Sequence, residues 1–317
     1  MVQEQESEVL FLPESDELRF LPEGPYSCGE GKFSWVAIQH GSDLTVGSLN
    51  IYDMASSRNA SHPLTARPGF AFPTNRSHVF VVGLERSLTL VNVQTLESTL
   101  LCDEIDSEVE DTIINDGIVF GEGLVFGAKH LEFSDKRAGL YFWRRRDRRL
   151  FQLRDDQICS NGKIIRECDG QTYLLDIDSP TKTVVEYPFD IDQGRLGEPS
   201  IVIDLRAGDA FPDGMIATPD GQGAIIAFFN PGNTPHGEAR QYHLADGALQ
   251  KIWTTPGSPQ VTCPQLVRFE DHVELVLTTA VEGMPPERQA IHPNAGAIFH
   301  AATNFGQVSA QPVFDAD

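Results

Sequence analysis

At several places in this chain, a glycine directly follows a side chain that carries a carboxylate or an amide. The pairs are Glu23-Gly24, Asp116-Gly117 (preceded by Asn115), Asn161-Gly162 and Asp213-Gly214. Carboxylates that are held close together repel one another unless a bound cation offsets their charge. All these donors are hard oxygens. If the fold gathers them, they predict a site for Ca²⁺, with Mg²⁺, Mn²⁺ and Zn²⁺ as the alternatives.

An internal repeat supplies the elements that could gather these side chains. The repeat positions are Gly24, Gly69, Gly117, Gly162 and Gly214, with Pro264 as a degenerate last copy, so the steps are 45 to 52 residues. In each copy a stronger β run and two weaker ones follow. This pattern predicts an all-β fold, a six-bladed β-propeller with four-stranded blades around a central channel, formed by residues 1–317 as a single domain. The oxygen donors would then share one mouth of the channel.

The strand pattern makes further predictions about the blades. Consecutive apolar residues at 36–38, 79–82 and 225–229 are typical of strands buried on both faces. Residues 8–12 are expected to add a strand to the last blade, and residues 308–314 to form its outer strand. Asp213-Gly214 is expected to form a turn before an innermost strand, with Asp220-Gly221 as the hairpin turn that follows. A pair of β-sandwiches is the alternative fold.

The composition limits the classes of partner. The formal net charge of −22 would repel nucleic acid, and the basic stretch at 143–149 is interpreted as a solvated turn. The sequence shows no apolar run of membrane-spanning length and no signal peptide, so we expect no membrane partner. Five cysteines without a Cys-x-x-Cys pattern favour a reducing, cytoplasmic location. No serine-hydrolase elbow or phosphate-binding loop is found, and the oligomeric state is left open.

Several segments resemble motifs of the senescence marker protein/gluconolactonase/luciferin-regenerating enzyme family, which includes regucalcin. They are "LPEGPYS" (21–27), "NDGIVFGEG" (115–123), "CSNGKIIRECDGQTYLLDIDSPTKTVVEYPFD" (159–190), "FPDGMIATPDG" (211–221) and "VTCPQLVRFEDHVELVLTTAVEGM" (261–284). The resemblance implies a six-bladed propeller with one divalent metal, held by Glu23, Asn161 and Asp213. It also implies that Asn115 faces the substrate, with Asp116 beside it, and that Asp213 is the general base for lactone hydrolysis.

The chain departs from this family at positions that would contact the substrate. The resemblance implies an arginine two residues before Asn115, where this chain has Ile113. The stretch "FGAKHLEF" (126–133) also differs, although Glu132 is still expected to reach the pocket. His130 and His236 are further candidates for substrate contact near the same mouth. These departures favour a small lactone or related ester over gluconolactone itself.

The predicted function is therefore metal-dependent hydrolysis of a small-molecule lactone or ester. The metal would polarise the carbonyl group while a water molecule attacks and a carboxylate accepts the proton of that water. Asp213 is a weak base if it binds the metal, because a cation lowers its pKa, so Asp116 is the alternative base. A calcium-binding propeller without catalysis is the main alternative function. Metal-dependent hydrolysis of phosphotriesters or aryl esters is the third.

Overall fold

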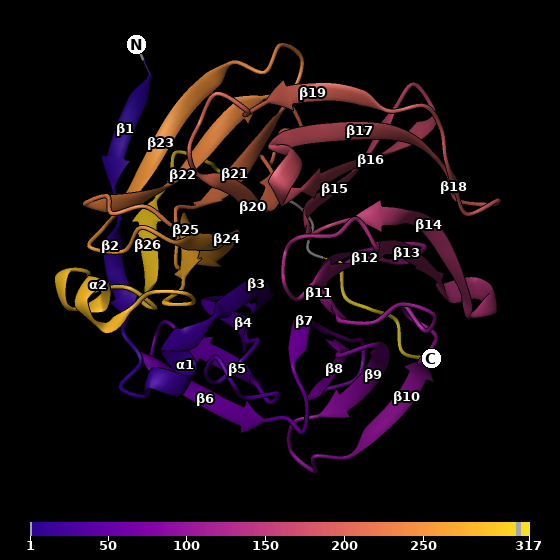
Figure 1. Cartoon of the computed structure of the whole chain (residues 1–317), viewed down its shortest axis with the longest axis horizontal. Helices are drawn as coiled ribbons and strands as arrows, with labels where there is room; N and C mark the ends of the chain where they lie inside the picture. Colours follow the sequence, from indigo (N-terminus) through magenta and orange to yellow (C-terminus); the bar gives the residue numbers. More distant parts are fainter. Residues whose placement is uncertain (1, 309–311) are drawn as a thin grey trace. The chain divides into compact units, whose positions relative to one another are not determined.

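The chain folds mostly into β-strands in a computed structural model, which describes residues 2–308 and 312–317 (Figure 1). The strands form six sheets of four or five strands, and most strands pair with their neighbours in the sequence. This arrangement confirms the predicted all-β fold, a six-bladed β-propeller. The chain divides into two compact units. Unit 1 comprises Met1–Pro68 and Ala207–Gln311, and unit 2 comprises Gly69–Arg206 and Pro312–Asp317.

Unit 1 contains the first, fifth and sixth blades. Their strands are β3 (Pro22–Gly29), β4 (Lys32–Ala37), β5 (Ser48–Asp53) and β6 (Arg58–Pro63); β20 (Phe211–Ala217), β21 (Gly223–Phe229), β22 (His236–His243) and β23 (Leu249–Pro256); and β24 (Val261–Phe269), β25 (His272–Thr279) and β26 (Ile298–Ala302). The N-terminal strand β2 (Glu8–Phe11) pairs with β26, which confirms the predicted addition to the last blade. Strand β1 (Gln3–Glu6) lies parallel to β23, and the sequence did not predict this pairing.

Unit 2 contains the second, third and fourth blades. Their strands are β7 (Pro68–Pro73), β8 (Val79–Leu84), β9 (Ser87–Asn92) and β10 (Ser98–Cys102); β11 (Thr112–Phe120), β12 (Gly123–His130), β13 (Ala138–Arg144) and β14 (Arg149–Gln157); and β15 (Ser160–Cys168), β16 (Gln171–Asp178), β17 (Thr183–Asp190), β18 (Arg195–Leu196) and β19 (Ser200–Asp204). Two 3₁₀ turns connect strands within a blade: η1 (Arg145–Asp147) follows β13 in the third blade, and η2 (Ser179–Thr181) follows β16 in the fourth. The predicted solvated turn is confirmed only for the middle of the basic stretch at 143–149, where η1 connects β13 to β14. Trp143 and Arg144 are instead buried at the end of β13.

The prediction that residues 308–314 form the outer strand of the last blade is wrong. Strand β2 takes that position beside β26, so no outer place remains for the C-terminal segment. Residues 309–311 lie outside the described part of the chain. Phe314 instead forms a β-bridge with Thr74, which directly follows β7 in unit 2.

The core is built from side chains that pack between neighbouring sheets. Strand β12 is buried at every position and β21 at all but its last, as expected for strands covered on both faces. Trp253 and Phe299 belong to one cluster between the fifth and sixth blades, and Phe142 and Phe189 to another between the third and fourth. Burial of such large apolar side chains stabilises the fold by about 1.5–3 kcal/mol each.

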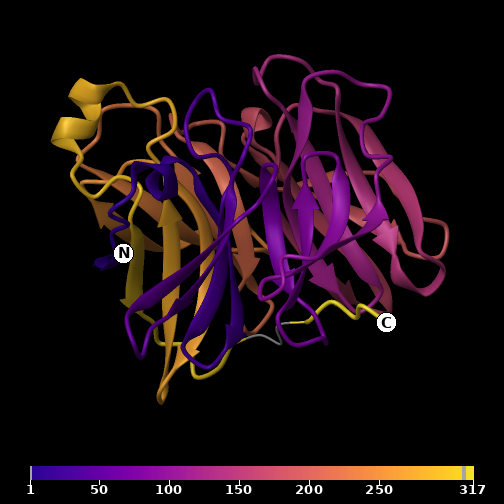
Figure 2. The same ribbon diagram turned by 90° about the horizontal axis from the view of Figure 1, so that it is seen from below.

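Two short helices cover one end of unit 1. These are α1 (Asp16–Phe20) and α2 (Pro286–Ile291). Arg19 of α1 donates through its guanidinium to the carbonyl oxygen of Ala295, in the segment that follows α2, at 2.7 Å. Figure 2 shows α2 beyond the end of the strands. The segment with α2 connects β25 to β26, so it lies at the end of the sheet where β24 begins. Among the described residues, no helix has the length and apolar character needed to cross a membrane.

Candidate active site

The candidate side chains lie on the first strand of their blades, where pairing with the second strand is interrupted. Register shifts fall between Glu23 and Tyr26, Ile114 and Asp116, Asn161 and Lys163, Pro212 and Met215, and Val261 and Cys263. Such shifts are β-bulges, which redirect side chains and are frequent beside active sites. The glycines at the repeat positions of the sequence therefore indicate a bulge that recurs from blade to blade.

The prediction that Asp213-Gly214 forms a turn is wrong, because both residues lie inside β20. A glycine is required at position 214 because a strand of the next blade packs closely against it. A Cβ atom on Gly214 would lie 2.5 Å from Sγ of Cys263 and 2.8 Å from its Cα, too close for any other residue. The hairpin turn is formed at Asp220-Gly221, as predicted, with Gly221 in the left-handed conformation at φ 69°.

In unit 1, the two predicted carboxylate ligands flank the start of β24. Asp213 is buried and precedes Gly214, which contacts Cys263. Glu23 is half-buried and follows Pro22, whose carbonyl oxygen accepts a hydrogen bond from Thr262 Oγ1 at 2.7 Å. The two carboxylates therefore occupy the same repeat position in their blades, on either side of Thr262–Cys263.

In unit 2, the two predicted amide side chains contact each other directly. Nδ2 of Asn115 donates to Oδ1 of Asn161 at 2.8 Å and to the carbonyl oxygen of Ser160 at 3.0 Å. Nδ2 of Asn161 donates to Oγ of Ser179 at 2.8 Å and approaches Sγ of Cys159 at 3.4 Å. Both asparagines are buried, so these contacts fix the orientation of each amide.

This orientation decides which atoms remain for chemistry. An amide nitrogen has two N–H donors, and in both asparagines the donors are taken by protein atoms. The amide oxygens keep acceptor capacity, since Oδ1 of Asn161 uses one lone pair to accept from Asn115. The site in unit 2 therefore offers oxygen acceptors, which suit a cation, a water molecule or a hydroxyl group.

Asp116 lies beside this pair and is partly exposed. Its Oδ1 accepts a hydrogen bond from the backbone N–H of Gly117 at 2.7 Å. The surrounding protein raises the pKa of this carboxyl group through desolvation, while the charge of Lys163 acts in the opposite direction. A carboxylate with a raised pKa that water can reach is suited to act as a general base.

A buried ion pair contacts the backbone of Asn161. Lys163 donates through Nζ to the carbonyl oxygen of Asn161 at 2.8 Å and to Oγ of Ser160 at 2.9 Å, and it lies 3.5 Å from Oδ1 of Asp176. Burial raises the pKa of Asp176, and the nearby ammonium group opposes that shift. This pair was missed in the sequence, where Lys163 stands in an apparently ordinary strand.

The Ser160–Lys163 pair has the spacing and distance of a serine–lysine catalytic dyad, but its surroundings exclude that role. Ser160 is 0% exposed, so a substrate cannot reach its hydroxyl group. A lysine that acts as a base must be neutral, whereas the Lys163 ammonium group lies beside the carboxylate of Asp176. We therefore assign the pair to positioning of the β15 bulge.

A second buried lysine lies opposite Ile113, where the resemblance implies an arginine. Lys129 is the cross-strand partner of Ile113, and its backbone also bridges to Cys159. The residue is only 6% exposed, and its Nζ lies 5.5 Å from the centre of the Phe133 ring. The signal that could have identified Lys129 is a charged residue inside an otherwise apolar strand.

The other predicted substrate contacts occupy different environments. Glu132 is exposed in the turn after β12. His130 is buried, and its Nδ1 accepts the backbone N–H of Asp135 at 3.3 Å, so it helps to close that turn. His236, in unit 1, lines a cavity of about 240 Å³ together with Phe228 and Arg240.

The bulged first strands and their oxygen-rich side chains define the class of protein as a six-bladed β-propeller with a candidate cation site. Residues 21–281 match the SMP-30/Gluconolactonase/LRE-like region, and the chain belongs to this family.

Similar proteins include one named as a putative lactonase and one described as calcium-binding. The chain is 29% identical over 182 residues to the Bacillus subtilis (strain 168) protein named "Putative sugar lactone lactonase YvrE", a match that covers 57% of this chain and 58% of that protein. The structure resembles a calcium-binding protein, regucalcin, from Agrobacterium tumefaciens, with TM-score 0.79, 19% identity, and coverage of 99% and 98% of the two chains. It also resembles a luciferin-regenerating enzyme, with TM-score 0.78, 15% identity, and coverage of 95% and 97%. At these identities, the structural likeness establishes the fold alone.

The donor chemistry of the predicted ligands fits a hard divalent cation. Glu23 and Asp213 carry carboxylate oxygens. The amide nitrogen of Asn161 is engaged as a donor to Ser179, so its amide oxygen is the atom that is suited to bind a cation. Oxygen donors of these kinds bind Ca²⁺, Mg²⁺ and Mn²⁺, whereas a soft ion would favour thiolate or imidazole ligands.

Proposed function

We propose that the protein is a metal-dependent hydrolase that opens a small lactone or a related ester. Family membership supports hydrolysis, and the orientation of the Asn115 and Asn161 amides supports it most directly at the level of residues. That orientation leaves oxygen acceptors for a cation and a water molecule. Glu23, Asp213 and Asn161 are the proposed ligands, with Ca²⁺ as the expected ion and a cytoplasmic location as part of the proposal.

The proposed mechanism divides the work among the side chains of this chain. When bound, a divalent cation polarises the ester carbonyl and stabilises the charge that develops on its oxygen. Asn115 orients the attacking water or a substrate hydroxyl group through Oδ1, because both of its N–H donors are taken. Asp116 accepts the proton of the water, since its raised pKa makes it a stronger base than a carboxylate bound to a cation.

Lys129 extends the proposal to substrate preference. Its ammonium group is the proposed replacement for the arginine that the resemblance implies at the position of Ile113, because the two residues face each other across β11 and β12. A buried ammonium group attracts carboxylate, carbonyl and hydroxyl oxygens. Lactones that carry such a group next to the ring are therefore the preferred substrates.

The test is a panel of lactones, aryl esters and phosphotriesters, assayed with EDTA-treated protein before and after addition of Ca²⁺, Mg²⁺, Mn²⁺ or Zn²⁺. The proposal expects turnover of at least one lactone or carboxylic ester that depends on the added ion. Turnover that is equal with and without metal would contradict the metal-dependent mechanism.

The second candidate function is calcium binding without catalysis. It is favoured by the similarity to the calcium-binding protein regucalcin and by the apolar residue at position 113. Tight Ca²⁺ binding in calorimetry, together with no turnover across the panel, would support this function over the hydrolase.

A further inference from the structure

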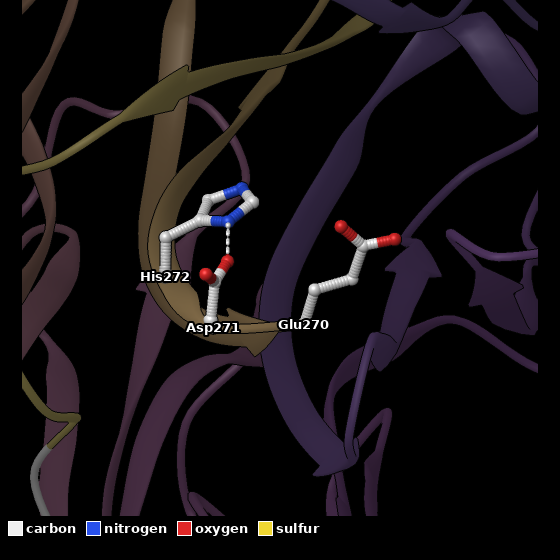
Figure 3. A group of neighbouring side chains, drawn as sticks. All are labelled: Glu270, Asp271 and His272. Atoms are coloured by element: carbon white, nitrogen blue, oxygen red, sulfur yellow. Dashed lines mark hydrogen bonds and ion pairs between the residues drawn. The ribbon is translucent and has the colours of Figure 1, made fainter.

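A second group of metal-ligating side chains lies at the hairpin between β24 and β25 in unit 1. Glu270, Asp271 and His272 are consecutive, and their ligating atoms lie within 4.8 Å of one another. Figure 3 shows the carboxylate of Asp271 in a hydrogen bond with one ring nitrogen of His272, with Glu270 beside them. This hairpin is at the opposite end of β24 from Cys263, so it is separate from the candidate active-site residues of that unit.

The other ring nitrogen of His272 points to a more enclosed set of ligands. Nε2 of His272 lies 2.9 Å from Oε1 of Glu274, and Oε2 of Glu274 lies 3.2 Å from Nδ1 of His300. The side chain of Glu274 is only 6% exposed, while those of His272 and His300 are 40% and 28% exposed. A buried carboxylate thus holds two imidazoles that solvent can reach.

Strand geometry explains why these three side chains meet. His272 and Glu274 are two residues apart on β25, so they point to the same face of the sheet. His300 lies on the neighbouring strand β26 opposite Val276, which also points to that face. Glu8 of β2 is the register partner of His300 and adds a further carboxylate at the edge of the sheet. Two positions on one strand and one on the next thus bring two imidazoles into contact with one carboxylate.

The contacts of this group suit a bound cation. A neutral imidazole has one N–H, but both nitrogens of His272 face carboxylate oxygens, from Asp271 and Glu274. A second positive species, either a proton or a metal ion, is needed to satisfy both contacts.

We propose that His272, Glu274 and His300 bind one divalent transition-metal ion, with Zn²⁺ as the preferred ion and Asp271 as the residue that orients His272. Imidazole nitrogens with one carboxylate form a ligand set that suits Zn²⁺ better than Ca²⁺. A carboxylate that accepts the second N–H of a ligating histidine is the usual support of such sites. The exposure of both imidazoles leaves room for water to complete the coordination.

The enclosed set is preferred to the three consecutive residues of the turn. The side chain of Asp271 is 99% exposed, and Glu270 is exposed as well, so a site built from them would have to order two solvated carboxylates. Glu274 is already held in place by its two imidazole partners. The proposal is independent of the hydrolase function, because none of its ligands belongs to the candidate active site.

The test is titration of the EDTA-treated protein with Zn²⁺ by calorimetry, and with Co²⁺ by visible absorption. Excess Ca²⁺ is kept in the buffer to occupy the oxygen-donor site. The wild type should bind one equivalent, and His272→Ala and His300→Ala should each abolish that binding. Asp271→Asn should weaken the affinity by about ten- to a hundredfold, because it removes only the support of His272.

Two variants serve as controls for this site. His243→Ala removes an imidazole that also contacts a carboxylate, Asp246 at 3.0 Å, but belongs to no such group, so the one-equivalent binding should be unchanged. Glu270→Gln should also leave it unchanged. Loss of binding in Glu270→Gln with retention in His300→Ala would overturn the proposal in favour of the turn. Full binding in the His272→Ala/His300→Ala double variant, with native circular dichroism, would refute it outright.

Discussion

The amide nitrogen of Asn115 donates a hydrogen bond to the amide oxygen of Asn161 at 2.8 Å. This bond joins the bulge of β11 to the bulge of β15, and it fixes which atom of each asparagine faces outward. The donor groups are turned into the protein, so the oxygen atoms are left for a cation and for water. Removal of either amide should therefore affect chemistry as well as packing.

Replacement of Asn115 with alanine should lower turnover with little loss of metal binding. Asn115 lies outside the proposed metal ligands, and loss of one oriented hydrogen bond at a reacting group costs about 3 kcal/mol, or roughly 10²–10³ in kcat. The measurement is kcat on the best lactone, together with Ca²⁺ affinity by calorimetry. Asn50→Ala is the control, since Asn50 is also buried, within β5, but lies in the other unit. An unchanged kcat in Asn115→Ala would remove this residue from the mechanism.

Replacement of Asp213 with asparagine should abolish both turnover and tight Ca²⁺ binding. The substitution keeps the shape of the side chain but removes a charge that the proposed cation needs. Asp220→Asn is the matched control, because Asp220 lies in the same hairpin and accepts its hydrogen bonds at an exposed turn. If Asp213→Asn binds Ca²⁺ as tightly as the wild type, then Asp213 is not a ligand.

The sequence was sufficient to predict the fold because the repeat is carried by local features. Five of the six blades have a glycine at the repeat position, the sixth has Pro264 there, and each blade has its own apolar strand. These features can be read without knowledge of the partner strand. The same phase led to the positions of Glu23, Asn161 and Asp213, which remain predicted ligands.

Features that depend on pairing between strands could not be predicted in this way. The turn predicted at Asp213-Gly214 is a bulge, because the requirement for glycine comes from Cys263 on another blade. The position of Lys129 opposite Ile113 likewise appears only once the register of β11 and β12 is known. The pairing of β1 with β23 joins residues almost 250 positions apart, and the sequence carries no local sign of it.

Replacement of Gly127 with alanine should destabilise the protein and disturb the site. A Cβ atom at this position would lie 2.0 Å from Oγ of Ser160, the residue before Asn161. Overpacking of this kind costs about 1–3 kcal/mol in the free energy of unfolding. Gly121→Ala in the adjacent turn is the control, because a Cβ atom there would meet no heavy atom within 4 Å. Denaturant titration should separate the two variants, and equal stabilities would contradict the packing of β12 against β15.

The thiol groups should differ in their reaction with iodoacetamide. Burial raises the pKa of Cys28 to about 11, so little of its reactive thiolate is present near neutral pH. Cys168 is exposed and should be alkylated first. Because the pKa of Cys28 is raised, its rate should increase by about tenfold per pH unit until the pH approaches that value. Peptide mapping by mass spectrometry measures both rates, and equally fast labelling near pH 8 would contradict the burial of Cys28.

Replacement of Lys129 with methionine should change which lactones are hydrolysed rather than whether hydrolysis occurs. Methionine keeps the length of the side chain but removes its charge. A hydrogen bond to a charged group contributes about 1.5–3 kcal/mol, so KM for a lactone with a carboxylate or hydroxyl substituent should rise about tenfold or more. KM for an unsubstituted lactone should stay the same, and Lys129→Arg should restore much of the preference.

The matched control for this prediction is Lys251→Met. Lys251 is also buried, but its ammonium group already donates to Gln5 Oε1 at 2.7 Å and lies over the ring of Trp253. Its replacement should lower stability without changing the ratio of the two KM values. The hydroxy acid product carries a carboxylate, so its inhibition constant should rise in Lys129→Met alone. If both lactones and the product respond equally to the two substitutions, Lys129 has only a structural role, and the substrate preference must come from other residues of the site.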